Sequence, residues 1–233
     1  MKTRPRLTRR ELLRTSGGAL GLYALSTHVP QSSAQEKKDE AAPSKRDPAR
    51  LKRLLEEMDS KGPQFWSVPR KDGEFLHLMV KATRAKRVLE VGTSHGFSAI
   101  WMGLALEETG GRLNTIESDR DRVELARKNL DEAGLAPVVN VIRGDGHVEV
   151  AKLGGPFDFV FLDADKEGQV DYFRKLYPKK LVPGAILLVH NAIRQASSMK
   201  DYLEMIRKQP EFDTVILSVT MDDGFCVSYR HRK

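Results

Sequence analysis

The chain has 233 residues, of which 40% are hydrophobic and 30% are charged. This length and composition predict one globular domain and exclude collagen-like, rod-like and wholly disordered proteins. The single cysteine, Cys226, excludes an internal disulfide and a cysteine-rich zinc site. No apolar run approaches the roughly 20 residues that cross a bilayer as a helix, so a stable membrane span is not expected.

The net charge of +7 is concentrated at the N-terminus. Acids and bases nearly balance beyond residue 34, whereas residues 1–34 carry Lys2, Arg4, Arg6, Arg9, Arg10 and Arg14 against Glu11. A nearly neutral body without a basic stripe argues against nucleic acid as a partner.

Residues 1–34 contain the three parts of an export signal in the usual order. The basic part, Thr8 to Arg14, contains Arg9-Arg10 and resembles a twin-arginine signal. A weakly apolar stretch and the small residues Ser32-Ser33-Ala34 follow it. We therefore expect export by the twin-arginine route. The alternative is a basic tail or membrane-surface anchor on a cytoplasmic protein.

A linker and then a folded domain follow the signal. Residues 35–50 are rich in Lys, Glu, Asp, Ala and Pro, which predicts a disordered linker before a domain over residues 51–233. Leucines and a methionine at helical spacing predict a first helix over 51–58, with Asp47 as N-cap and Gly62-Pro63 as its end. A second helix carries the apolar residues of 75–80.

Strands and helices then alternate. Apolar strands are predicted at Arg87–Val91, Arg112–Glu117, Val138–Arg143, Phe157–Leu162 and Ala185–Val189. Helices are predicted at Phe97–Glu108, Arg120–Glu132, Val148–Leu153, Val170–Tyr177 and Ser197–Lys208. Strands at Thr214–Thr220 and Phe225–Arg230 flank an Asp-Gly turn, which predicts a hairpin with an antiparallel last strand. The pattern indicates a doubly wound α/β domain with a mostly parallel seven-stranded sheet.

In such a sheet, ligands bind beyond the carboxyl ends of the strands. The first strand is followed by Gly92 and Gly96, whose turn lets the backbone approach a ligand at a helix N-terminus. Glu117 ends the second strand and could accept both ribose hydroxyls. The glycine spacing departs from the dinucleotide fingerprint and disfavours an NAD-linked oxidoreductase. Adenosine binding and a purely structural turn are equally supported at this point. Asp145 could contact an adenine, cap the next helix, or do both.

The fourth and fifth strands end in polar residues that suggest a cation site. Asp163-Ala164-Asp165-Lys166 follows the fourth strand, and His190-Asn191 follows the fifth. Because parallel neighbours end at one edge, Asp163, His190 and Asn191 could converge on one divalent cation. Taken singly, an aspartate here could cap a helix and a histidine could simply face solvent.

Together these strand ends resemble the small cation-dependent O-methyltransferases, which include the catechol and caffeoyl-CoA types and have a Rossmann-like class I methyltransferase fold. The likeness runs from about Gly62 to Tyr229. It implies S-adenosylmethionine (AdoMet) as cofactor, with its methionine end held by Val68, Glu90, Gly92 and Ser98. It also implies Glu117 at the ribose, Asp145 at the adenine, Asp163 at both cofactor and metal, and Lys166 as the general base. The implied metal ligands are Asp163, His190 and Asn191, with magnesium as the usual ion.

The resemblance further implies methylation of a small ortho-diphenol. A cation that binds both oxygens would lower the phenol pKa from about 10, and Lys166 would take the proton. His190 stands where the family usually has aspartate, so manganese or another transition ion could replace magnesium.

Phe65 and Trp66 could line the substrate ring or pack in the core. The competing hypothesis is an exported ligand-binding module without turnover, and a homodimer remains open.

Overall fold

A computed structural model describes residues 47–220 and 223–232. The predicted export signal and linker residues 35–46 lie outside these ranges. Helix α1 (Pro48–Ser60) begins inside the predicted linker, with the Asp47 carboxylate accepting from the Ala49 N–H at 2.9 Å. The described part of the chain begins at this N-cap, and residues 48–50 belong to the helix, whose first turn suits proline.

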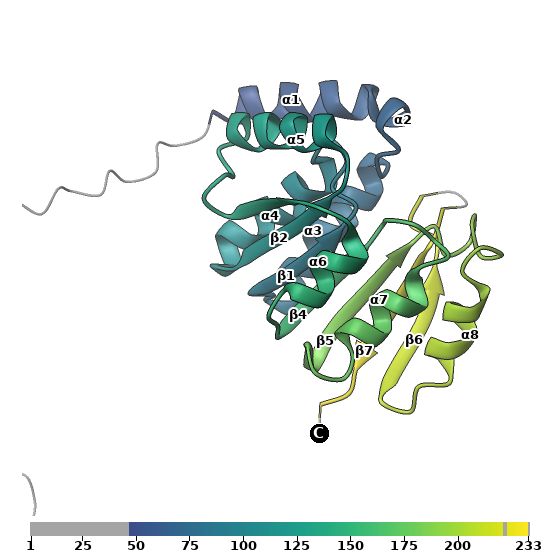
Figure 1. Ribbon diagram of the computed structural model, residues 1–233. Helices are drawn as coiled ribbons and strands as arrows, with labels where there is room; N and C mark the ends of the chain where they lie inside the picture. The colour runs from purple at the N-terminus through teal and green to yellow at the C-terminus, as the bar shows by residue number, and fades with distance from the viewer. Residues whose placement is uncertain (1–46, 221–222, 233) are drawn as a thin grey trace, which may run out of the picture. The chain divides into compact units, whose positions relative to one another are not determined.

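A seven-stranded sheet of order β3-β2-β1-β4-β5-β7-β6 forms the centre of the described chain (Figure 1). Strand β7 pairs antiparallel with both β5 and β6, whereas the pairs among β1 to β5 are parallel. This confirms the predicted fold class and the reversed last strand. The strands are β1 (Arg87–Val91), β2 (Arg112–Glu117), β3 (Val139–Arg143), β4 (Phe157–Leu162), β5 (Leu181–His190), β6 (Phe212–Leu217) and β7 (Phe225–Arg230).

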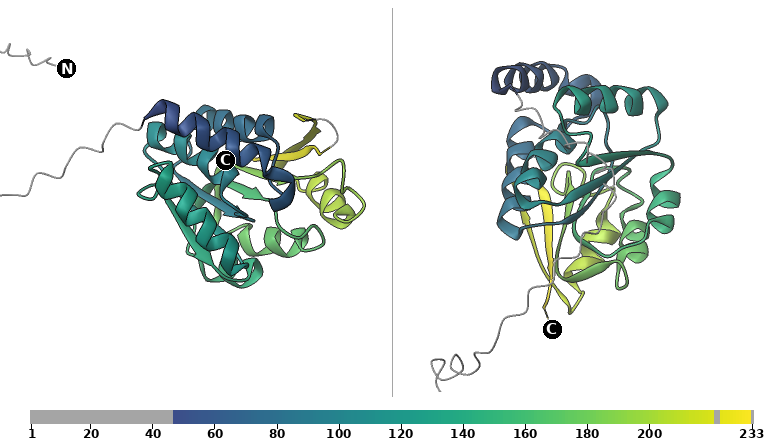
Figure 2. Two further views of the ribbon diagram at one scale, coloured as in Figure 1. Left: turned by 90° about the horizontal axis from the view of Figure 1, so that it is seen from above. Right: turned by 90° about the vertical axis from the view of Figure 1, so that its left-hand side faces the viewer.

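Helices cover both faces of the sheet, as the right-hand view of Figure 2 shows. The helices after α1 are α2 (Gly62–Phe65), α3 (Arg70–Thr83), α4 (Phe97–Thr109), α5 (Arg120–Glu132), α6 (Gly146–Lys152), α7 (Gln169–Leu176) and α8 (Lys200–Arg207). Phe159 and Phe161 of β4 join the cluster of α1, α3, α4 and α5, whereas Val160 and Leu162 join that of α6, α7 and α8. Alternate side chains of one buried strand thus build two cores, which explains the unbroken apolar run over residues 159–162.

Several predicted boundaries were wrong by a few residues. Helix α8 begins at Lys200, three residues late, because residues 191–199 form turns. Strand β5 begins at Leu181, before the predicted start at Ala185, and runs through Pro183-Gly184. Gly62-Pro63 ends α1 but also begins the short helix α2. Among the described residues, no helix is long and apolar enough to cross a membrane.

The parallel register places the functional strand ends at one edge of the sheet. Val91 pairs with both Ile116 and Leu162, and Leu162 pairs with Val189. The residues that follow these strands therefore lie next to one another along the carboxyl edge of the sheet. Gly92 has a φ of +102°, and a Cβ there would lie 2.4 Å from the Asp163 carbonyl oxygen. Only glycine lets the ends of β1 and β4 approach this closely.

Candidate active site

Two adjoining clefts open at this edge. The larger, about 770 Å³, lies between the segment from Gly62 to Pro69 and the ends of β4 and β5. The smaller, about 350 Å³, lies over the ends of β1, β2 and β3. Asp163 and Trp66 are among the residues that line both. We call the larger one the acceptor cleft and the smaller one the cofactor cleft.

Glu117 lies in the cofactor cleft, and backbone groups hold its carboxylate in place. Oε2 accepts from the Ser94 N–H at 2.7 Å, and Oε1 accepts from the N–H groups of Ser118 and Asp119 at 2.9 and 3.0 Å. These donors are neutral, so they orient the carboxylate without cancelling its charge. A carboxylate fixed in this way is suited to accept the hydroxyl hydrogens of a ribose.

Glu90 lies fully buried near the end of β1. The Ser98 hydroxyl donates to its Oε1 and the Thr115 hydroxyl to its Oε2, each at 2.5 Å. Burial raises the pKa of Glu90 to about 7, although these two hydrogen bonds oppose the rise. The carboxyl is therefore half ionised near neutral pH, and a bound cationic group would draw it into the charged form.

The other predicted cofactor residues lie at different places along this edge. Gly92 and Asp145 line the cofactor cleft, whereas Val68 is buried against the acceptor cleft. Ser98 is buried and turned onto Glu90. Asp145 is the N-cap of α6, where its Oδ1 accepts from the Val148 N–H at 3.0 Å. Its capping role is therefore present, and its exposed position leaves the adenine role open.

Asp163 is the central carboxylate of the acceptor cleft. Lys166 Nζ donates to Asp163 Oδ1 at 2.7 Å, and His190 Nδ1 lies 3.2 Å from the same oxygen. The side chains of Lys166 and Asp163 are only 10% and 11% exposed, so these contacts form largely out of water. Although burial acts to raise it, the positive charges of Lys166 and His190 lower the pKa of Asp163 to about 2.

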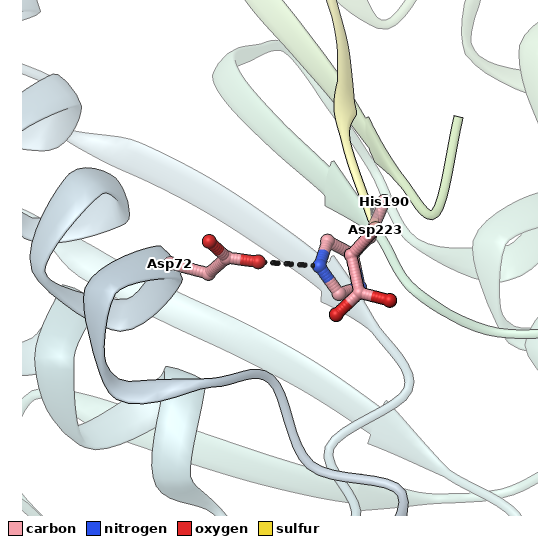
Figure 3. A group of neighbouring side chains, drawn as sticks. All are labelled: Asp72, His190 and Asp223. Atoms are coloured by element: carbon pink, nitrogen blue, oxygen red, sulfur yellow. Dashed lines mark hydrogen bonds and ion pairs between the residues drawn. The ribbon is translucent and has the colours of Figure 1, made fainter. Parts of the chain in front are cut away.

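His190 also contacts a carboxylate that the sequence did not predict. Its Nε2 lies 2.8 Å from Oδ2 of Asp72, which is fully buried in the first turn of α3 (Figure 3). Burial acts to lower the pKa of His190, but Asp163 and Asp72 outweigh it and raise that pKa to about 9. Both ring nitrogens are therefore engaged by carboxylates.

Asn191 and Asp223 complete the rim of the acceptor cleft. Asn191 Nδ2 donates to Asp223 Oδ1 at 3.3 Å, and Arg194 donates to the same oxygen at 3.3 Å. Asp72, His190 and Asp223 each offer one ligand atom, and these atoms lie within 4.8 Å of one another (Figure 3). This group is a second arrangement that could hold a metal ion.

The predicted ligands Asp163, His190 and Asn191 fit a divalent cation. Two ligand atoms on one small ion are about 3 Å apart when each bond is about 2.1 Å. The 3.2 Å between Asp163 Oδ1 and His190 Nδ1 agrees with this spacing. The Asn191 amide nitrogen is used by Asp223, which leaves its oxygen as the donor for a cation. Metal-bound histidines usually donate their other nitrogen to a carboxylate, as His190 can to Asp72.

Asp165 contacts one residue of α7 and one of α6. Its Oδ1 accepts from the Tyr172 hydroxyl at 2.8 Å, and its Oδ2 lies 3.3 Å from His147 Nε2. Both contacts turn the carboxylate toward α6 and α7.

The two aromatic residues before Val68 have different surroundings. Phe65 stacks on His95 with ring centroids 4.6 Å apart, which is the core contact. Trp66 is 81% exposed at the rim of both clefts, so of the two it is the one that can reach an acceptor ring.

Sequence reasoning missed Asp72 and Asp223 as site residues. Asp72 lies in a polar run at a helix start, where an acid ordinarily faces water and favours the helix dipole. In the sequence, Asp223 is typical of a turn residue in a hairpin. The sequence offers no signal that either one reaches His190, because the contacts join residues 118 and 33 positions apart.

Comparison with known proteins identifies the family of the chain. Residues 41–225 match the O-methyltransferase family. The chain is 37% identical over 178 residues to the catechol O-methyltransferase of Mycobacterium tuberculosis, covering 70% of this chain and 80% of that protein. The O-methyltransferase from Bacillus cereus in complex with SAH has a TM-score of 0.70 at 26% identity, over 79% of this chain and 91% of that one. A further structural relative is TomG from Streptomyces achromogenes, an O-methyltransferase involved in tomaymycin synthesis, in complex with SAM. It has a TM-score of 0.67 at 29% identity, over 77% of this chain and 90% of that one.

The sheet order, the reversed last strand and the acids at the strand ends define the class I methyltransferase fold. The chain belongs to the O-methyltransferase family and is an AdoMet-dependent O-methyltransferase.

Proposed function

We propose that the protein transfers the methyl group of AdoMet to one hydroxyl of a catechol-like small molecule with the help of a divalent cation. The observation that carries this proposal is the contact set around Asp163, which stands at the boundary of both clefts and touches both Lys166 and His190. The catechol O-methyltransferase of Mycobacterium tuberculosis, 37% identical, supports the same acceptor class.

The cofactor cleft has the charge that AdoMet requires. AdoMet supplies a methyl group on a positively charged sulfur. Glu117 would hold the ribose hydroxyls, and Glu90, once ionised, would attract the ammonium group at the methionine end. Ser98 and Thr115 keep the Glu90 carboxylate oriented through their hydroxyls.

Lys166 is the base in this proposal. Its ammonium lies on Asp163, which fixes the Nζ atom at the wall that the two clefts share. Lys166 would accept the phenolic proton as the neutral amine, after its ammonium proton has passed to solvent. Asp163 thus orients the base, and the walls of the acceptor cleft hold the phenol toward the cofactor cleft.

A divalent cation would be held by Asp163, His190 and Asn191. When bound, such an ion supplies positive charge that lowers the pKa of a neighbouring phenol. With imidazole as one ligand, manganese, cobalt or zinc should compete well with magnesium, which prefers oxygen.

Product analysis tests this function. The full chain is treated with a chelator and incubated with AdoMet, catechol and one divalent ion at a time. We expect a monomethylated product that appears only with an added ion. Resorcinol is the matched control, because its hydroxyls cannot both reach one cation. Equal methylation of the two compounds would contradict the ortho-diphenol requirement, and AdoMet binding without product from catechol or other diphenols would favour the non-catalytic ligand-binding module.

We also propose that residues 1–34 direct export by the twin-arginine route. The support is the order of the basic, apolar and small-residue parts in the sequence. Fusing residues 1–40 to a reporter tests this, with Arg9→Lys and Arg10→Lys made together as the comparison. We expect the parent fusion to be exported and the doubly changed one to be retained. Equal export of both fusions would contradict the twin-arginine route, and retention of both would leave the protein in the cytoplasm.

A further inference from the structure

Asp72 is a buried carboxylate whose side chain contacts the His190 ring. It is fully buried, and its Oδ2 lies 2.8 Å from His190 Nε2. Its other oxygen, Oδ1, is buried and has no hydrogen-bond partner among the described residues. A buried carboxylate is costly unless it is paired, so the contact with His190 is what Asp72 gains at this position.

The backbone fixes Asp72 firmly. It lies in the first turn of α3, where free N–H groups and the helix dipole favour a negative charge. The next residue, Gly73, lies directly against the Trp101 ring of α4, with no room for a side chain. Helix α3 is therefore closely packed on α4, and the Asp72 carboxylate cannot easily withdraw from His190.

The two nitrogens of His190 have unequal partners. Nε2 faces Asp72, which is out of water, whereas Nδ1 faces Asp163 at the longer distance of 3.2 Å. Asp163 also accepts from Lys166, so it already has a donor. A neutral imidazole carries one proton and one lone pair. When a cation displaces one proton from the ring, the shorter contact favours keeping the remaining proton on Nε2, and the lone pair of Nδ1 then points to the side of Asp163 and Asn191.

We propose that Asp72 is a positioning residue that holds the proton of His190 on Nε2 and so presents Nδ1, beside Asp163, as the nitrogen that binds the divalent cation. The inference rests on the proposed use of a cation and adds which atom binds it. It also separates two arrangements, because an ion that took Asp72 as a ligand would lie beside Nε2, the nitrogen that faces Asp72.

The proposal has a consequence for ion selectivity. A neutral imidazole in a fixed orientation is a good ligand for zinc, cobalt and manganese and a poor one for magnesium. Asp72 would strengthen this preference, since a carboxylate on the far nitrogen makes the near one a better donor. Loss of Asp72 should therefore weaken zinc binding more than magnesium binding.

The test reads the His190 ring directly. The full chain is labelled with ¹⁵N in its histidines, saturated with Zn²⁺, and studied by long-range ¹H–¹⁵N correlation NMR, with the His190 signals assigned by their loss in His190→Gln. We expect the proton on Nε2 and the metal on Nδ1. Metal on Nε2 would overturn the proposal in favour of the cluster with Asp223. A ring with protons on both nitrogens would overturn it by showing that His190 is not a ligand.

Asp72→Asn provides the second measurement, because it keeps the size of the side chain and removes its charge. Calorimetric titration should show about 10–100-fold weaker Zn²⁺ binding, the usual effect of losing such a partner. Glu74→Gln is the matched control on the same helix, since Glu74 is exposed and pairs with Arg70. Parent-like Zn²⁺ affinity in a folded Asp72→Asn protein would overturn the positioning role. Methyl transfer that persists in chelator, with no ion bound by the parent, would instead overturn the cation requirement of the proposed function.

Discussion

The cofactor cleft and the acceptor cleft hold their carboxylates in different ways. Glu90 and Glu117 accept hydrogen bonds from hydroxyl and backbone N–H groups, which carry no charge. Asp163, by contrast, lies between Lys166 and His190. One cleft therefore offers a cationic ligand carboxyl groups that neutral donors hold in place, and the other balances its charges internally until a ligand or ion arrives.

The strongest challenge to this comparison removes the ammonium group of Lys166 from the acceptor cleft. Lys166→Met should lower kcat by about 10²–10⁴-fold, because a positioned base contributes that much to proton transfer. The affinity for AdoMet should change little, since the contacts of Glu90 and Glu117 are untouched. Turnover and calorimetry measure the two effects, with the exposed Lys152→Met as control. Near-parental turnover with catechol at neutral pH would remove Lys166 from the mechanism.

Changing the imidazole to a carboxylate tests the internal charge balance. His190→Asp would bring a third acid against Asp72 and Asp163, so the ion-free protein should lose thermal stability. The ratio of magnesium to zinc affinity should rise by on the order of tenfold or more, the scale at which metal-site changes act. Calorimetry and melting curves with and without each ion measure both effects. An identical ranking of ions in the two proteins would mean that His190 is not a ligand.

The charge of Glu90 should make cofactor binding depend on pH. Because burial raises the pKa of Glu90 to about 7, the carboxyl is neutral below that pH and charged above it. AdoMet affinity should therefore fall as pH falls through 7, by up to about tenfold per pH unit. Glu90→Gln should bind AdoMet weakly and with a flatter pH profile. A parent profile that is flat between pH 5.5 and 8.5 would contradict the role of Glu90.

The smallest effect is expected at Asp145, where capping and adenine binding can be separated. Asp145→Asn keeps an N-cap, so thermal stability should be nearly unchanged, whereas Asp145→Ala should cost about 1 kcal/mol. If Asp145 accepts from an adenine amino group, Asp145→Ala should weaken AdoMet binding by about tenfold or more, the value of one hydrogen bond to a charged group, whereas Asp145→Asn keeps an oxygen acceptor and should lose less. Unchanged AdoMet affinity in both would leave Asp145 as a cap only.

The sequence predicted the sheet because its signals are local. Five apolar strands separated by amphipathic helices leave few alternatives, and the polar residues after each strand mark one edge. The errors lie where local signals mislead, as at Pro183-Gly184 inside β5 and at the turns before α8. The site was harder to predict. The sequence places Asp163 and His190 side by side, but the approach of Asp72 depends on how α3 packs against α4, which no local pattern encodes.

Asp163 lies on the wall that the two clefts share, and this has a thermodynamic consequence. A ligand that enters either cleft changes the surroundings of the same carboxylate, so the two binding events cannot be independent. Linkage makes this effect reciprocal. If bound AdoMet changes the affinity for the acceptor by some factor, the bound acceptor changes the affinity for AdoMet by the same factor. The order in which the two ligands arrive therefore cannot alter the total free energy of the ternary complex, only the path by which it forms.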